Sequence, residues 1–116
     1  MRIRSAAFLT LTLSVPLLLA GCSGHPGAGT WQFPQGAEYR RLVVQFDGRA
    51  EFFRPGREQP AQRCFWAGDS ARSIVLQCQD AERADIEREY RLKVNAAGDA
   101  ELMLGQRLVA QLRRQS

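Results

Sequence analysis

The chain has 116 residues, with 16 lysines and arginines against 12 aspartates and glutamates, which gives a formal net charge of +4. This length suffices for one small domain and excludes a multidomain protein. The chain contains one histidine, His25, which argues against a zinc site built on several imidazoles and against a Ser-His-Asp triad.

The N-terminus has the order of residues that is typical of an exported protein. Arg2 and Arg4 form a short positive region, and residues 6–20 form an apolar stretch interrupted only by small polar residues and a proline. The stretch is too short for a membrane span and predicts the core of a signal peptide. It ends in Leu19-Ala20-Gly21-Cys22, which resembles the lipobox of bacterial lipoproteins. The resemblance implies that residues 1–21 are a signal peptide and that Cys22 carries a lipid. The alternative is an ordinary secretory signal with an incidental cysteine.

The resemblance also implies a location. Ser23 follows the lipidated position, and in lipoproteins of the enteric type a residue other than aspartate there favours transfer to the outer membrane. We therefore expect a lipid-anchored protein on the periplasmic face of the outer membrane, with no cofactor beyond the lipid on Cys22. Cleavage removes Arg2 and Arg4 and leaves a net charge near +2, from 14 basic and 12 acidic residues. This low charge, together with the compartment, argues against a nucleic-acid partner.

Residues 22–29 are rich in glycine and proline and predict the lipidated cysteine followed by a flexible linker. His25 lies in this segment, where a solvated histidine is expected and a metal ligand or pH sensor is the alternative. The next residues, Gly29-Thr30-Trp31, resemble the G-x-W motif of lipocalins. The resemblance implies that Trp31 closes a barrel floor beneath an arginine from a late strand, with Arg107 or Arg113 as candidates. A plain core role for Trp31 is the alternative.

From residue 30 onward, short alternating segments are separated by turn residues, which predicts an all-β domain over residues 30–116. Seven or eight antiparallel strands in a meander would close, wholly or partly, into a small barrel. The expected strands cover 30–33, 39–47, 49–54, 63–67, 72–80, 90–95, 101–104 and 107–113. Within them we expect inward faces that include Phe46 and Leu108, and a tight hairpin turn at Asp47-Gly48. Residues 81–87 contain helix formers and could make one or two helical turns.

Two cysteines remain beyond the signal. In an oxidising periplasm, Cys64 and Cys78 predict a disulfide, and the thirteen residues between them differ from the C-x-x-C spacing of redox pairs. If the two cysteines face each other across a hairpin, Trp66 faces Leu76 by the same register. The bridge would then staple this hairpin, and a redox switch is the alternative.

The sequence predicts neither an active site nor a metal site. The acidic residues between 80 and 89 could supply paired carboxylates for glycosidic chemistry, but arginines interleave with them and indicate a solvated, ion-paired face. The same run lacks the residue pattern of a calcium loop. We therefore expect no enzymatic activity.

Apolar residues also occur on the strand faces opposite the expected core, and these predict a docking groove or sheet edge for a protein partner. The candidates are Phe53, Phe65, Val75, Met103 and Val109. The alternative is that a flattened barrel buries parts of both faces, or that the register shifts by one residue.

In size, lipobox, β-meander and cysteine pair, the chain resembles the pilotins of type III secretion systems, which carry a secretin to the outer membrane. This resemblance implies a non-catalytic docking or assembly factor. A second resemblance is to membrane-bound inhibitors of c-type lysozyme, although residues 68–72 only echo their Ser-Ala-Ser-Gly loop. A periplasmic inhibitor or immunity protein and a lipocalin-like carrier of an apolar ligand therefore remain alternatives.

Overall fold

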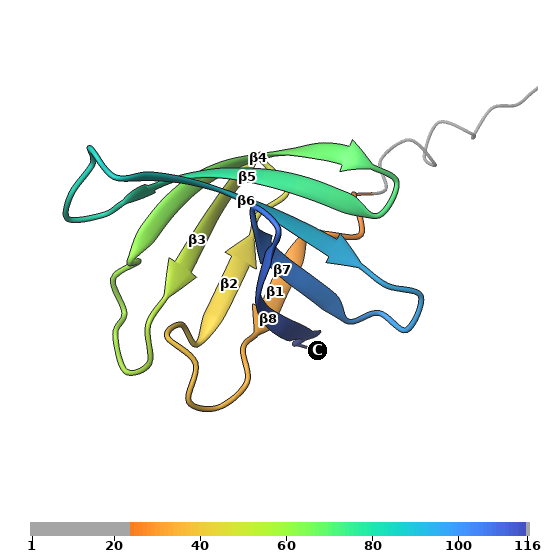
Figure 1. The fold of residues 1–116 in the computed structure, drawn as a ribbon, viewed down its shortest axis with the longest axis horizontal. Helices are drawn as coiled ribbons and strands as arrows, with labels where there is room; N and C mark the ends of the chain where they lie inside the picture. Colours follow the sequence, from red (N-terminus) through yellow and green to blue (C-terminus); the bar gives the residue numbers. More distant parts are fainter. Residues whose placement is uncertain (1–23, 116) are drawn as a thin grey trace, which may run out of the picture.

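The computed structural model describes residues 24–115 (Figure 1). They form a closed antiparallel barrel in which each strand pairs with its neighbours in the sequence and the last strand pairs with the first. The all-β prediction is confirmed. The strands are β1 (Gly29–Gln32), β2 (Arg41–Val44), β3 (Arg49–Phe53), β4 (Gln62–Ser70), β5 (Ser73–Asp80), β6 (Glu87–Val94), β7 (Ala100–Leu104) and β8 (Arg107–Arg114).

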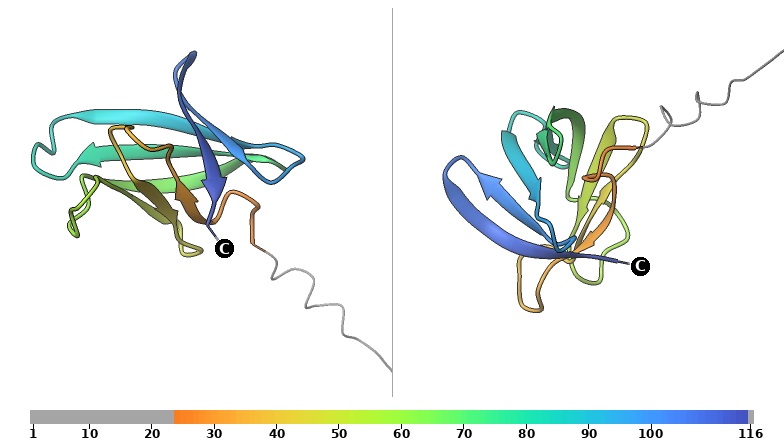
Figure 2. Two further views of the ribbon diagram at one scale, coloured as in Figure 1. Left: turned by 90° about the horizontal axis from the view of Figure 1, so that it is seen from below. Right: turned by 90° about the vertical axis from the view of Figure 1, so that its right-hand side faces the viewer.

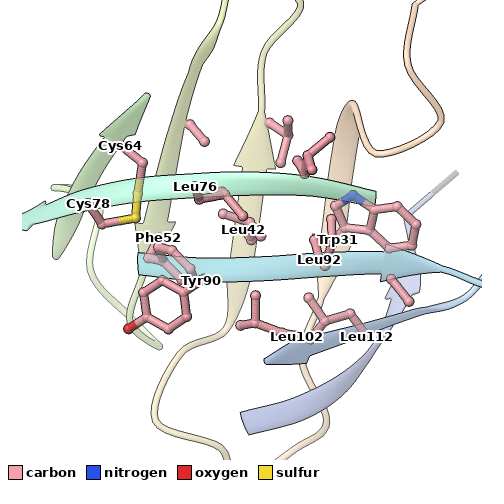
Figure 3. Close-up of a cluster of buried hydrophobic side chains, with 14 of the residues drawn as sticks. Trp31, Leu42, Phe52, Cys64, Leu76, Cys78, Tyr90, Leu92, Leu102 and Leu112 are labelled. Carbon is pink, nitrogen blue, oxygen red and sulfur yellow. A yellow bond between two sulfur atoms is a disulfide. The ribbon is translucent and has the colours of Figure 1, made fainter. Parts of the chain in front are cut away.

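The core follows from the alternation of side chains along each strand. One face of every strand points into the barrel, where large side chains from all sides meet (Figure 3). Fully buried members include Trp31, Leu42, Phe52, Ile74, Leu76, Leu92, Leu102 and Leu112. Burying a side chain of this size contributes about 1.5–3 kcal/mol, so the filled interior is the main source of stability.

The hairpin of β4 and β5 has the predicted register. Cys64 pairs with Cys78 and Trp66 with Leu76. The two cysteines form a disulfide, their Cα atoms lie 4.0 Å apart, and both side chains are buried beside Tyr90 (Figure 3).

The β2–β3 turn differs from the tight two-residue turn that Asp47-Gly48 predicted. The Gly48 N–H donates to the Gln45 carbonyl, and the Gln45 N–H donates to the Arg49 carbonyl at 2.8 Å. The turn therefore has Phe46 and Asp47 at its centre, and Gly48 takes the left-handed conformation at φ 93°. As a result Phe46, which was expected inside, is 77% exposed.

A β-bulge in β8 changes which side chains point inward. The pairing between β7 and β8 shifts by one residue, from Leu102 with Ala110 to Met103 with Leu108. Val109 is the extra residue and packs against the core, whereas Leu108 is 45% exposed. The expectation of an inward Leu108 and an outward Val109 was wrong, because strict alternation cannot reveal an inserted residue.

The segment that could have been helical is the loop between β5 and β6. The Asp80 carboxylate accepts hydrogen bonds from the backbone N–H groups of Glu82 and Arg83 at 2.9 and 3.0 Å. These bonds hold the pKa of Asp80 below its ordinary value. Asp80 thus fixes a loop, and within residues 24–115 the structure contains no helix.

Residues 24–28 follow a fixed path across one end of the barrel, although a flexible linker was expected there. Gly27 and Ala28 are buried. The His25 ring accepts the Gly27 N–H through Nδ1 at 2.9 Å and lies 2.7 Å from the Ser70 carbonyl through Nε2. A neutral ring with its proton on Nε2 satisfies both bonds. Through these contacts the segment covers the part of β4 that extends beyond β3.

Candidate partner-docking surface

Cys22 and the predicted signal peptide lie outside the described residues. Over residues 24–115, the structure contains no helix that is long and apolar enough to cross a membrane.

The five predicted docking residues do not form one surface. Phe53 is only 7% exposed, because the Arg41 guanidinium covers its ring at 4.2 Å from the centroid. It therefore contributes nothing to an exposed surface. Val75 and Met103 are half-buried, and Val109 packs against the core. Among the five, Phe65 is the one that is largely exposed, at 72%.

Phe65 lies on the outer face of β4, in a trough of about 830 Å³ over strands β3 to β6. Its cross-strand neighbours are Arg49 and Gln77. The other charged lining residues are Glu51, Arg63, Glu87, Arg88 and Glu89. The trough is therefore polar, because three arginines and three glutamates line it around the single aromatic ring of Phe65.

A different feature, the outer edge of β8, is both apolar and unpaired. The barrel closes through only two residue pairs, Trp31 with Arg114 and Gln32 with Arg113, and one further bond from the Gln115 N–H to the Thr30 carbonyl. Within residues 24–115, no strand pairs with Arg107–Leu112 on the β1 side. Figure 2 shows the start of β8 standing apart from β1, whereas β7 remains paired with β6. We call this stretch, Arg107–Leu112, the β8 edge.

Backbone polarity at the β8 edge follows from strand alternation. Because the Gln115 N–H points toward β1, residues two and four positions earlier point their backbone groups the same way. The N–H and C=O of Gln111 therefore face outward on the unpaired side. Such groups are a template for the addition of another strand.

The side chains around the β8 edge are apolar. Leu108 is exposed, and Leu104, Val109 and Ala110 are partly buried against the core. Arginines flank this set at Arg107 and Arg113. Sequence reasoning identified Met103 and Val109 in this region but missed Leu104 and Leu108, because the bulge and the narrow closure depend on contacts between distant residues.

A buried polar network stabilises the same end of the barrel. The Gln62 side chain, which is 0% exposed, donates from Nε2 to the hydroxyls of Tyr39 and Tyr90 at 2.8 and 2.9 Å. Arg88 donates to its Oε1 at 3.4 Å. Burial raises the pKa of Tyr39, and the neighbouring Tyr90 raises this pKa further. The network satisfies every Gln62 amide group without exposing it to water.

The opposite end of the barrel contains the arrangement that the G-x-W motif implied. Arg114 from β8 stacks on Trp31, with its guanidinium carbon 4.2 Å from the ring centroid. The arginine is neither Arg107 nor Arg113, but the alternation that places Leu112 inside places Arg114 on the same side.

Within residues 24–115 there is no cluster of three or more histidine, cysteine, aspartate or glutamate side chains that could hold a metal ion. Of the ion-paired face expected between residues 80 and 91, the described part of the chain shows one ion pair, between Arg91 and Asp69 at 3.0 Å.

Comparisons with models of known protein families, with curated proteins and with solved structures find no match to this chain. The fold alone thus defines the class, a small eight-stranded up-and-down antiparallel barrel.

Proposed function

We propose that this chain is a lipid-anchored protein of the outer membrane that docks a protein partner of the envelope and performs no catalysis. The observation that carries the proposal is the β8 edge, whose β1-facing side has no partner strand within residues 24–115 and is lined by Leu104, Leu108 and Val109. An extended partner segment could add to this edge through main-chain hydrogen bonds, while its side chains contact the apolar residues.

The packed interior favours docking over ligand transport. Trp31, Phe52 and Leu92 are fully buried inside the barrel, where a lipocalin-like carrier would need space for its ligand. A partner of this domain therefore binds to its outer surface.

In the pilotin-like form of the proposal, the partner is the secretin of a secretion system, and the lipid on Cys22 carries the pair to the outer membrane. The lipobox supports the anchor, and the β8 edge supports capture of an extended segment of the secretin.

The test uses the full-length lipoprotein in its own bacterium. Deletion of the gene should leave secretin multimers in the wrong membrane, and membrane fractionation measures their location. If the multimers assemble in the outer membrane without this protein, the pilotin-like form fails.

Variants at the β8 edge test the docking site itself. Gln111→Pro removes an outward N–H without touching the ladder to β7, because proline is tolerated where the N–H faces solvent. It should abolish co-purification with the secretin, whereas Gln111→Ala, which keeps the N–H, should not. Leu108→Arg gives a second loss-of-binding variant at a position that is already exposed. Retained binding in both variants would move the docking site elsewhere, with the trough around Phe65 as the next candidate.

A further inference from the structure

Phe46 lies in an unusual place, beside the point where the described chain begins. Its ring rests directly against Gly24, so that a Cβ atom built on Gly24 would lie 2.7 Å from Phe46 Cδ1. A single exposed phenylalanine is ordinary on a protein surface. What requires an explanation is that the Phe46 ring lies next to the segment that leads to the proposed lipid.

The distance between this ring and the lipid is limited by covalent geometry. Cys22 is two residues from Gly24, so its Cα lies at most about 7.6 Å from the Gly24 Cα. The headgroup and acyl boundary that interfacial side chains enter is about 5–10 Å deep. A ring that touches Gly24 is therefore within reach of the interface whenever Cys22 carries a membrane-inserted lipid.

Gly24 is itself the start of a segment that is attached to the barrel. The next residue, His25, bonds to the Ser70 carbonyl, and Arg114 donates to the carbonyls of Pro26 and Ala28. The β2–β3 turn is held in the same cluster, because Trp66 donates from Nε1 to the Gln45 carbonyl at 2.7 Å. The orientation of Phe46 relative to the attachment point is thus set by the fold.

The charges of the turn fit a membrane surface. The one acidic residue beside Phe46, Asp47, accepts two side-chain bonds from Arg49 at 2.9 and 3.1 Å. This pair compensates the carboxylate charge that would otherwise face the phosphates of the bilayer.

From these observations we propose that the β2–β3 turn is a membrane-contact site, in which Phe46 enters the lipid interface beside the lipid on Cys22. This inference rests on the proposed lipid anchor. The contact of Phe46 with the bilayer holds the barrel in one orientation, with the turn at Gly48 against the membrane. The β7–β8 turn at Gly105 lies at the opposite end of the barrel, so the start of the β8 edge points into the periplasm (Figure 2).

The experiment separates the anchor from the orientation. In the first arm, the mass of the protein purified from bacterial membranes reports whether Cys22 is cleaved and lipidated. An unmodified Cys22 would overturn both the anchor and this inference.

In the second arm, residues 22–116, which include the whole described barrel, are coupled through the Cys22 thiol to vesicles that contain a maleimide lipid. Cys22 is the available thiol, because Cys64 and Cys78 are joined. The vesicles contain brominated phosphatidylcholine, which quenches tryptophan fluorescence at the interface. The variants are Phe46→Trp and, as a control at an exposed apolar residue near the opposite end of the barrel, Leu108→Trp.

Trp31 and Trp66 are present in every variant, and their signal is subtracted. We expect the added fluorescence of F46W to be mostly quenched and that of L108W to be nearly unaffected. Equal quenching of the two variants, or no quenching of F46W, would overturn the membrane-contact site even when the first arm shows a lipidated Cys22.

Discussion

The guanidinium of Arg114 covers the indole of Trp31, with 4.2 Å between its central carbon and the ring centroid, and the same side chain donates to the Ala28 carbonyl at 2.8 Å. Arg114, at the end of the last strand, thereby contacts both the first strand and the segment that precedes it, and covers a fully buried core residue. Because the β1–β8 ladder contains only two residue pairs, this side chain is a substantial part of the barrel closure.

The first prediction concerns this closure. Arg114→Ala should lower the free energy of unfolding by about 2 kcal/mol, through the lost cation–π contact and the lost charged hydrogen bonds. Its neighbour Arg113 is exposed and makes no such contact with residues 24–115, so Arg113→Ala should change stability by less than about 0.5 kcal/mol. Urea unfolding followed by circular dichroism measures both. Equal effects of the two substitutions would contradict this role of Arg114.

The glycine of the G-x-W motif belongs to the same unit. Gly29 has a φ of 126°, and a Cβ atom there would lie 2.7 Å from Arg114 Nη1. Gly29→Ala should therefore destabilise the barrel both through backbone strain and through displacement of Arg114. In an Arg114→Ala background only the strain remains, so the cost of the second substitution should shrink. A double-mutant cycle measures this coupling, and strictly additive effects would show that Gly29 does not make room for the arginine.

The disulfide gives a prediction about the unfolded chain. Cys64 and Cys78 are separated by 14 positions, and closing a loop of this size stabilises a protein by about 3 kcal/mol in the chain-entropy estimate. The double variant Cys64→Ala/Cys78→Ala should lose roughly that much free energy of unfolding. Reductant should bring the wild-type protein to a similar value and leave the double variant unchanged. A wild-type protein whose stability is insensitive to reductant would show that the bridge contributes little.

Much of the fold was predictable because strand periodicity is local. Leu42, Val44, Leu92 and Leu102 point inward as the alternation predicts. A single constraint, the pairing of Cys64 with Cys78, also fixed the register of the β4–β5 hairpin from Gln62–Asp80 to Gly68–Ile74, and only the bulge next to the turn departs from it.

The parts that could not be predicted depend on contacts between distant residues. The bulge at Val109 leaves no trace in the composition of β8, yet it exchanges the faces of Val109 and Leu108. The exposure of Phe46 depends on which of two turn types the sequence Asp47-Gly48 adopts. The order of residues 24–28 depends on His25 meeting Ser70, 45 positions away.

For the candidate site, sequence reasoning found apolar residues but not the surface that they form. Phe53 is a large apolar residue of the kind expected in a docking surface, but the Arg41 guanidinium covers its ring. The unpaired edge of β8 arises because β1 has only four residues and β8 has eight, so the ladder between them is short. Unequal strand lengths of this kind become visible only when the pairing is known.

The last prediction uses the buried network around Gln62. Tyr39→Phe removes one of the two hydroxyls that accept hydrogen bonds from the Gln62 amide and leaves a buried N–H without a partner. At pH 7 this should lower the free energy of unfolding by about 1–3 kcal/mol. The pH dependence follows from the pKa of Tyr39, which burial and the neighbouring Tyr90 raise above the ordinary value of 10.0.

A raised pKa means that the unfolded chain loses this proton before the folded protein does. The contribution of Tyr39 is therefore complete below pH 10.0 and is lost as the pH rises through the raised value. Because phenylalanine does not titrate, the gap in stability between wild type and Tyr39→Phe should narrow above pH 10. Urea titrations at several pH values between neutral and strongly alkaline measure the gap, and a constant difference across that range would show that the phenol does not titrate with unfolding.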